Sequence, residues 1–231
     1  MRYNDRRTLG NGVGCMGWFK KSRNEELKNV PESVKRQYRC AFTGHRPEKV
    51  IGSEGRIIVE LRREIEKAIA DGYKVFLTGM SRGVDLWAAD IVLELRRYNK
   101  DLKLVCVIPF EGMEDRWPAD WKKHYDLVRR QADFVWVLSD RYSKDAYQKR
   151  NQWLVDHASR LIAVFNGSPS GTGNTIRYAR EMGVANRTLP EGRVSCVRDP
   201  GIERPRSCYG KAIDAFQYEV CGHRDPDHPA K

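Results

Sequence analysis

The sequence lacks the features that would place it in a membrane or outside the cell. It contains no run of about 18 apolar residues, so no membrane-spanning helix is expected. Residues 1–21 are basic but hold no continuous apolar segment, which argues against a secretory signal peptide. We therefore expect a cytoplasmic protein without a membrane partner.

Cysteine is sparse and dispersed, and no CxxC pair occurs. Cys40 and Cys106 fall in apolar segments with the character of buried strands, which is typical of free thiols in a reducing compartment. Four residues near the C-terminus could be grouped into a zinc set: Cys208, Cys221, His223 and His228. Their spacing is irregular, so we expect unrelated residues and predict no metal site.

Charge is abundant and positive, with a formal net charge of +11. Residues 1–37 hold 9 basic and 4 acidic side chains, residues 38–190 hold 26 and 20, and residues 191–231 hold 7 and 7. An excess spread in this way favours anionic ligands in general. By itself it does not establish nucleic-acid binding, because a basic surface without a partner gives the same count.

Short apolar segments alternate with amphipathic segments between residues 38 and 190. Strands are predicted at 38–44, 73–79, 102–110, 133–139 and 159–165, with a sixth considered near 193–197. Helices are predicted at 54–71, 84–98, 119–132, 145–157 and 175–182. Apolar strands that are each followed by a helix indicate a mainly parallel sheet covered on both faces. Right-handed crossovers then predict a doubly wound, Rossmann-like α/β domain with three layers, α/β/α.

The regular pattern defines three parts of the chain. Residues 1–37 form a basic leader, expected to be weakly ordered apart from a short helix within 25–37. Residues 38–190 form the predicted domain. Residues 191–231 are rich in proline, glycine and charge, which predicts a loosely ordered tail.

Ligands of open α/β sheets bind beyond the carboxyl ends of the strands, at the topological switch point. Small, hydroxylated and cationic residues collect at those ends in this sequence. The candidate ligand-binding residues are Thr43, Gly44, His45, Arg46, Thr78, Gly79, Ser81, Arg82, Gly83, Asp85, Pro109, Phe110, Asn166, Gly167, Gly171, Thr172, Gly173, Asn174 and Thr175.

The loop at 166–175 is the most informative of these segments. Glycine allows close approach of backbone amides to a ligand, and the following helix start adds unpaired donors and a positive dipole end. The loop therefore has the composition of a phosphate cradle, although it is not a Walker A loop. The alternative is a flexible connection that Thr172 or Thr175 caps.

Individual side chains in the earlier loops each have two interpretations. Asp85 either complements a helix start or accepts a hydrogen bond from a ribose hydroxyl or base amine, away from any phosphate. Arg82 is a phosphate clamp or a solvated cation. His45 can titrate near neutral pH and Arg46 can grip phosphate through two hydrogen bonds, unless both belong to an exposed turn.

Two further groups of side chains could reach the site. Arg150 and Asn151 lie on the predicted helix before the fifth strand, where one helical face could point to the cleft. Trp117 is the tryptophan considered for base stacking, whereas Trp121, Trp136 and Trp153 are expected to pack in the core or at its rim.

Five motifs in order resemble the YpsA/YoqJ-like branch of the SLOG superfamily over residues 38–185. They are FTGHRPEK (42–49), LTGMSRGVDLWAAD (77–90), VIPFEGMEDRW (107–117), KRNQWLVDHASRLIAVFNG (149–167) and SGTGNTIRYA (170–179). The resemblance implies a Rossmann-like domain of the SLOG type that binds nucleotide-derived ligands. The superfamily also contains DprA, a DNA-processing protein, and the LOG phosphoribohydrolases.

The resemblance leaves three functions open. LOG enzymes carry a PGGxGTxxE motif with a glutamate that works in N-glycosidic cleavage, and Thr175 stands at that position here. The main hypothesis is therefore binding or sensing of a phosphate-bearing nucleotide derivative without robust catalysis, with no other cofactor. A LOG-like hydrolase is the alternative. DprA-like binding of single-stranded DNA is the second alternative, not favoured because no aromatic and basic platform is evident. A homo-oligomer is compatible with all three.

Overall fold

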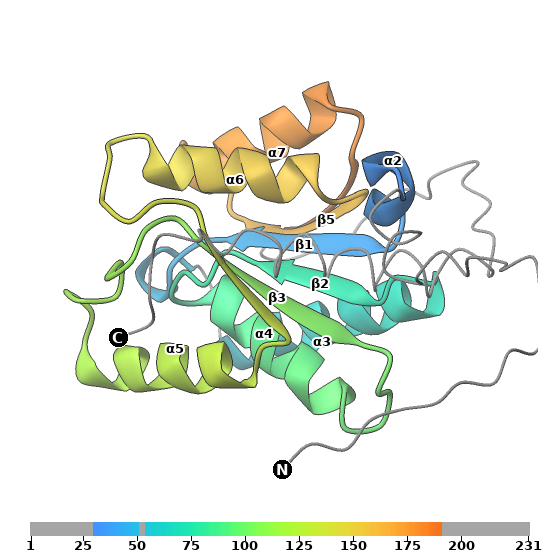
Figure 1. The fold of residues 1–231 in the computed structure, drawn as a ribbon, viewed down its shortest axis with the longest axis horizontal. Coiled ribbons are helices and arrows are strands. Elements are labelled where there is room, and N and C mark those ends of the chain that lie inside the picture. The colour runs from blue at the N-terminus through green and yellow to red at the C-terminus, as the bar shows by residue number, and fades with distance from the viewer. Residues whose placement is uncertain (1–29, 51–53, 191–231) are drawn as a thin grey trace, which may run out of the picture.

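The computed structural model describes residues 30–50 and 54–190, which contain one sheet of six parallel strands (Figure 1). The strands are β1 (Arg39–Gly44), β2 (Val75–Thr78), β3 (Lys103–Ile108), β4 (Phe134–Val137), β5 (Arg160–Phe165) and β6 (Ala185–Pro190). The helices are α2 (Glu32–Arg36), α3 (Glu54–Ala70), α4 (Val84–Leu95), α5 (Ala119–Gln131), α6 (Ala146–Asp156) and α7 (Gly171–Glu181), with a short 3-10 helix η1 (Pro47–Lys49).

The strand order is β4-β3-β2-β1-β5-β6, and all neighbours are parallel. The chain builds outward from β1 to β4 and then returns to the other side of β1 to form β5 and β6. The predicted doubly wound sheet is thus confirmed. The direction of winding reverses between β1 and β5, which makes the carboxyl ends of these two strands the topological switch point.

Helices cover both faces of the sheet. The helices α3, α4 and α5 lie on one face, and α6 and α7 lie on the other (Figure 1). Alternate residues of β1 accordingly enter two separate cores, Cys40 and Phe42 on the α3–α5 side and Ala41 on the α6–α7 side. Burial on both faces explains why the central strands are continuously apolar.

The sixth strand, the start of α7 and the end of the leader differ in detail from the sequence expectation. The sixth strand is Ala185–Pro190, whereas the segment 193–197 lies outside the described residues. Helix α7 begins at Gly171, four residues before the predicted start, because Ser170 caps it. The end of the expected leader is helical in α2 and contacts the domain, since Arg36 donates to the Ala158 carbonyl at 3.1 Å.

Cys40 and Cys106 are free and buried, as predicted. The other four cysteines and the considered zinc set lie outside the described residues. None of the helices in the described part of the chain is long and apolar enough to cross a membrane.

Candidate functional site

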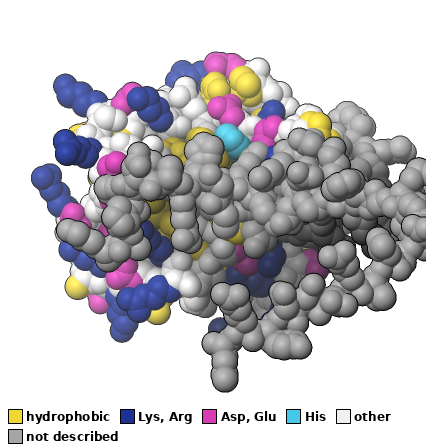
Figure 2. Space-filling view, viewed as in Figure 1, with side chains coloured by type: hydrophobic (Ala, Val, Ile, Leu, Met, Phe, Trp, Pro, Cys, Tyr) yellow, Lys and Arg dark blue, Asp and Glu magenta, His cyan; other side chains and the backbone are white. Residues whose placement is uncertain are grey.

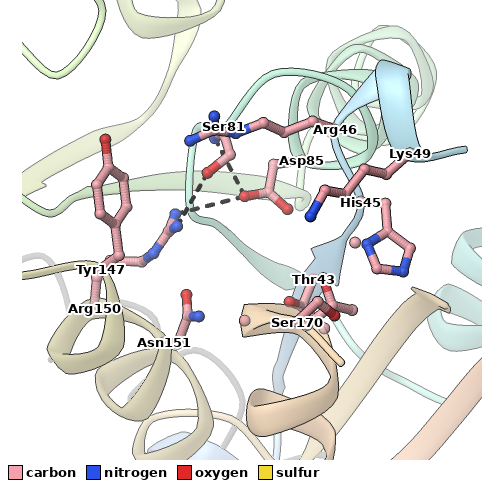
Figure 3. Close-up of a pocket in the computed structure, with 13 residues that line it drawn as sticks. Thr43, His45, Arg46, Lys49, Ser81, Asp85, Tyr147, Arg150, Asn151 and Ser170 are labelled. Carbon is pink, nitrogen blue, oxygen red and sulfur yellow. Dashed lines mark hydrogen bonds and ion pairs between the residues drawn. The ribbon is translucent and has the colours of Figure 1, made fainter. Parts of the chain in front are cut away.

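A cleft of about 240 Å³ opens at the topological switch point (Figure 3). It combines the loop after β1, the loop between β2 and α4, one face of α6 and the first turn of α7. Thirteen residues line it: Thr43, Gly44, His45, Arg46, Lys49, Ser81, Asp85, Tyr147, Arg150, Asn151, Ser170, Gly171 and Thr172.

The structure brings eight of the nineteen sequence-predicted residues to this cleft. They are Thr43, Gly44, His45, Arg46, Ser81, Asp85, Gly171 and Thr172. The other eleven do not line it: Thr78, Gly79, Arg82, Gly83, Pro109, Phe110, Asn166, Gly167, Gly173, Asn174 and Thr175. Gly79 and Gly83 lie directly behind the lining residues Arg150 and His45.

The loop after β1 is held against the start of α4 by two glycines. A side chain at Gly44 would overlap Val84, so only glycine lets the helix approach the strand end. Gly83 has φ +88°, and a Cβ there would lie 2.8 Å from the His45 carbonyl oxygen. His45 is buried by this packing and stacks on Phe165 with ring centroids 5.5 Å apart. The neighbouring Arg46 is exposed at the mouth of the cleft.

A buried ion pair joins α4 to α6 at the base of the cleft. Arg150 Nη1 lies 3.5 Å from Asp85 Oδ2, and the two side chains are 5% and 6% exposed. The same guanidinium donates to the Gly79 carbonyl and, through Nη2, to Ser81 Oγ at 3.0 Å. The Ser81 amide donates to Asp85 Oδ2 at 3.2 Å. Gly79 is required behind this cluster because a methyl group there would overlap the Arg150 guanidinium.

Burial acts on both partners of this pair. It raises the pKa of Asp85, an effect that Arg150 and the hydrogen bonds from Ser81 oppose. It lowers the pKa of Arg150, an effect that Asp85 opposes. Each charge therefore depends on the other, and removal of one would leave an uncompensated charge in a dry environment.

The first turn of α7 supplies backbone donors to the cleft. Ser170 is the N-cap, and its Oγ accepts a hydrogen bond from the Gly173 amide at 3.2 Å. The Gly171 and Thr172 amides belong to the helix start, where no intrahelical acceptor is available. The helix dipole adds positive potential at the same point. The cap by Thr172 or Thr175, which the sequence offered as the alternative, does not form because Ser170 caps the helix.

The side chain of Thr175 does not line the cleft. It is buried, and its Oγ1 donates to the Gly171 carbonyl at 2.8 Å. The position at which a LOG-like glutamate would stand therefore holds a hydroxyl that is bonded within its own helix. Gly173 also faces inward, where a Cβ would lie 3.1 Å from the Phe165 ring.

Positive charge exceeds negative charge around the cleft. Arg46, Lys49 and Arg150 line it, whereas Asp85 is the single carboxylate among its thirteen lining residues. Arg46 and Lys49 form no salt bridge with any residue that the structure describes. Figure 2 shows Lys and Arg side chains along the left-hand side of the molecule, towards which the strands end in Figure 1. The cleft mouth therefore favours an anion.

Phe110, predicted from its place after β3, does not line the cleft but packs against one lining residue, Tyr147. Phe110 packs edge-on against Tyr142 and Tyr147, at centroid distances of 5.3 and 5.6 Å. Trp117, considered for base stacking, packs edge-on against Tyr125 at 5.6 Å and does not line the cleft. Arg82 pairs with Glu48 at 2.8 Å instead of facing an anion.

Five lining residues are not among the nineteen candidates from the sequence: Lys49, Tyr147, Arg150, Asn151 and Ser170. Tyr147, Arg150 and Asn151 have the spacing i, i+3 and i+4, so they share one face of α6. This spacing is the signal in the sequence, and it places Arg150 and Asn151 on the helical face that could point to the cleft. Lys49 gave no such signal because its position depends on the turn η1.

Comparisons with known proteins agree with the motifs. Similar proteins include a UPF0398 protein of Bacillus thuringiensis (strain Al Hakam), 31% identical over 118 residues, with 50% of this chain and 64% of that protein covered. A UPF0398 protein of Bacillus cereus (strain G9842) is 30% identical over 124 residues, covering 53% and 67%. The match to the first of these spans less than two thirds of its length.

The matches among solved structures include two DNA processing proteins A. The protein from Streptococcus pneumoniae gives a TM-score of 0.49 at 16% identity, covering 81% of this chain and 59% of that chain. The protein from Helicobacter pylori, described for its single-stranded DNA binding mode, gives 0.46 at 17% identity, covering 84% of each.

A family model agrees with the expected assignment over most of the described domain. The model described as the YspA SLOG family matches residues 40–187, which is more than half of the chain. The matched segment begins in β1 and ends in β6, so it includes every element that lines the cleft. The chain therefore belongs to the YspA SLOG family.

Proposed function

We propose that this protein binds a phosphate-bearing, nucleotide-type ligand in the switch-point cleft, without robust catalysis. The observation that carries the proposal is the meeting of the α7 helix start with Arg46 and Lys49 around one cleft. Two elements far apart in the sequence thus direct positive potential at the same small volume.

The phosphate belongs at the α7 end of the cleft. Backbone amides at a helix start bind anions through directed N–H groups and the helix dipole. Arg46 and Lys49 add cationic side chains that no described carboxylate neutralises. Asp85 lies at the base of the cleft on another element, so a phosphate at α7 avoids its repulsion.

The size and lining of the cleft favour a small ligand. Its volume of about 240 Å³ suits a nucleoside monophosphate better than a long dinucleotide. Tyr147 lines the same space and offers an aromatic surface to a base. Eleven of the thirteen lining residues have side chains with polar or charged groups, which fits a sugar phosphate.

The argument against robust catalysis rests on two residues. Thr175 carries a hydroxyl in place of a carboxylate, and this hydroxyl donates to the Gly171 carbonyl, so the position has no acid to assist departure of a base. Asp85 has one oxygen committed to Ser81 and Arg150. Incubation with AMP should therefore release no adenine above the rate in buffer.

Isothermal titration of the full chain tests the proposal. The panel contains AMP, ADP, ADP-ribose, NAD, inorganic phosphate and a single-stranded oligonucleotide at low ionic strength. We expect saturable binding of at least one nucleotide, weakened by added salt because the contacts are ionic. No heat and no thermal shift with any nucleotide would refute the proposal. A preference for the oligonucleotide over every mononucleotide would favour DNA binding instead.

A further inference from the structure

We infer that Asp85 accepts a hydrogen bond from a sugar hydroxyl of the ligand, so that the cleft selects ribose phosphates over deoxyribose phosphates. The inference rests on the proposed function, which it makes more specific. It depends on the free oxygen of Asp85 and on the position of this oxygen relative to the phosphate-binding helix start.

One oxygen of Asp85 is occupied and the other is not. Oδ2 accepts from the Ser81 amide and faces Arg150, as the dashed lines in Figure 3 show. Oδ1 is buried and has no hydrogen-bond partner among the described residues. In Figure 3 this oxygen turns away from Arg150, towards the part of the cleft near Lys49. A buried carboxylate oxygen without a hydrogen-bond donor destabilises the protein, so a ligand that donates to this oxygen gains binding free energy.

Arg150 fixes the carboxylate in this orientation. Its guanidinium is held on three sides, by the Gly79 carbonyl, Ser81 Oγ and Asp85 Oδ2. Since these contacts use Nη1 and Nη2, Arg150 is a positioning residue and not a free phosphate ligand. The carboxylate is therefore set in place before any ligand enters, which lowers the entropic cost of binding.

The chemistry of Asp85 specifies a neutral donor close to the phosphate. A carboxylate repels phosphate but accepts from a hydroxyl or an amine. Both Asp85 and the α7 helix start line one cleft of about 240 Å³, so the donor must lie near the phosphate in the ligand. In a nucleoside monophosphate the sugar hydroxyls lie nearer to the phosphate than the base amine does. Ribose hydroxyls thus fit better than an adenine amine.

Titrations of the unaltered full chain with AMP, 2′-deoxy-AMP, 3′-deoxy-AMP, IMP, ribose 5-phosphate and inorganic phosphate test the inference. We expect AMP, IMP and ribose 5-phosphate to bind, and loss of the hydroxyl that meets Asp85 to weaken binding by about tenfold or more, because it leaves a buried acceptor unpaired. Equal binding of AMP and both deoxy forms would overturn the inference and leave the proposed function intact. A loss seen with IMP but with neither deoxy form would assign the contact to the base. Binding of no phosphate compound would overturn both.

A pair of variants on the same helix locates the effect. Asp85→Asn should reduce the preference for AMP over the weaker deoxy analogue to less than about threefold, since a neutral amide is a poorer acceptor. Asp90→Asn is the matched control, because Asp90 is exposed on α4 and pairs with His124 away from the cleft. Retention of the full preference in Asp85→Asn would contradict the inference. If Asp85→Asn fails to fold, the ligand series on the unaltered chain still decides.

Discussion

The parallel strands all start at one side of the sheet, the amino edge, and end at the opposite side, the carboxyl edge. Both sides carry cationic side chains, but these side chains have different partners. At the amino edge, cations at the strand starts are paired: Arg39 with Glu32 at 2.5 Å and Arg160 with Asp71 at 2.8 Å. At the carboxyl edge, Arg46 and Lys49 line the cleft and have no carboxylate partner among the described residues. Neutralised cations hold the fold together, whereas unneutralised cations at the switch point remain available to an anion.

The pattern continues along the amino edge. Lys74, just before β2, lies 2.9 Å from Asp101, and Lys103 of β3 lies 3.2 Å from Asp133. Asp133 also accepts from Arg96 and from the Leu104 amide. The two edges thus differ in whether a carboxylate lies beside each cation. The net charge of the chain does not reveal this difference. Substitutions at each edge should therefore separate stability from binding.

The largest expected effect concerns the buried pair of Asp85 and Arg150 at the carboxyl edge. Arg150→Met should lower the free energy of unfolding by about 3–5 kcal/mol, because Asp85 is left as an uncompensated buried charge. Urea unfolding measures this change. The double variant Arg150→Met, Asp85→Asn should lose less than Arg150→Met alone. A loss below about 1 kcal/mol in the single variant would show that the pair is not buried as described.

The next effect belongs to the amino edge. Arg160 is buried, pairs with Asp71 and lies 4.3 Å from the centre of the Tyr73 ring. Arg160→Met should lower the free energy of unfolding by about 1–2 kcal/mol through the lost cation–π contact and packing. The affinity for AMP, measured by titration, should not change. A weaker affinity with unchanged stability would contradict the division between the edges.

At the mouth of the cleft, the expected effect is on binding alone. Arg46→Ala should weaken AMP binding by about tenfold, or about 1.4 kcal/mol, with stability within about 0.5 kcal/mol of the unaltered chain. Arg141→Ala is the matched control, because Arg141 is an exposed arginine in the loop after β4 and does not line the cleft. Equal losses in both variants would indicate a diffuse charge effect in place of a site.

The smallest effect is a pH dependence at the amino edge. His157 stacks on Trp153 with centroids 3.8 Å apart, and burial lowers its pKa from 6.5. As pH falls below 6.5, the unfolded chain binds the proton first, so the free energy of unfolding decreases by at most about 1.4 kcal/mol per pH unit. His157→Phe should keep the stacking and reduce this slope in urea titrations between pH 7.5 and 5. An unchanged slope would exclude His157 as its source.

The sequence predicted most of the fold because the central strands are buried on both faces. Their apolar runs are unambiguous, as in 159–165, which became β5. The edge strand β6 was not predicted at its position, since only half of its residues, ANRTLP, are apolar and it pairs on one side only. The start of α7 was placed too late because glycines argue against a helix, while the Ser170 cap that permits it depends on one side-chain contact.

The sequence predicts which loops lie at the carboxyl edge, but it does not predict which of them form the cleft. All five loops at the carboxyl edge have suggestive residues, but the strand order selects those after β1, β2 and β5. Phe110 follows β3, which lies two strands from β1, and it packs with Tyr142 and Tyr147. The role of Arg150 depends on contact between α6 and α4, which a single sequence does not specify.

A crystal structure of the full chain grown with AMP tests the central claim most directly. The account predicts the phosphate within hydrogen-bonding distance of the Gly171 and Thr172 amides, with Arg46 close by and a ribose hydroxyl on Asp85 Oδ1. A phosphate bound at the amino edge, or a cleft left empty while AMP binds elsewhere, would contradict it.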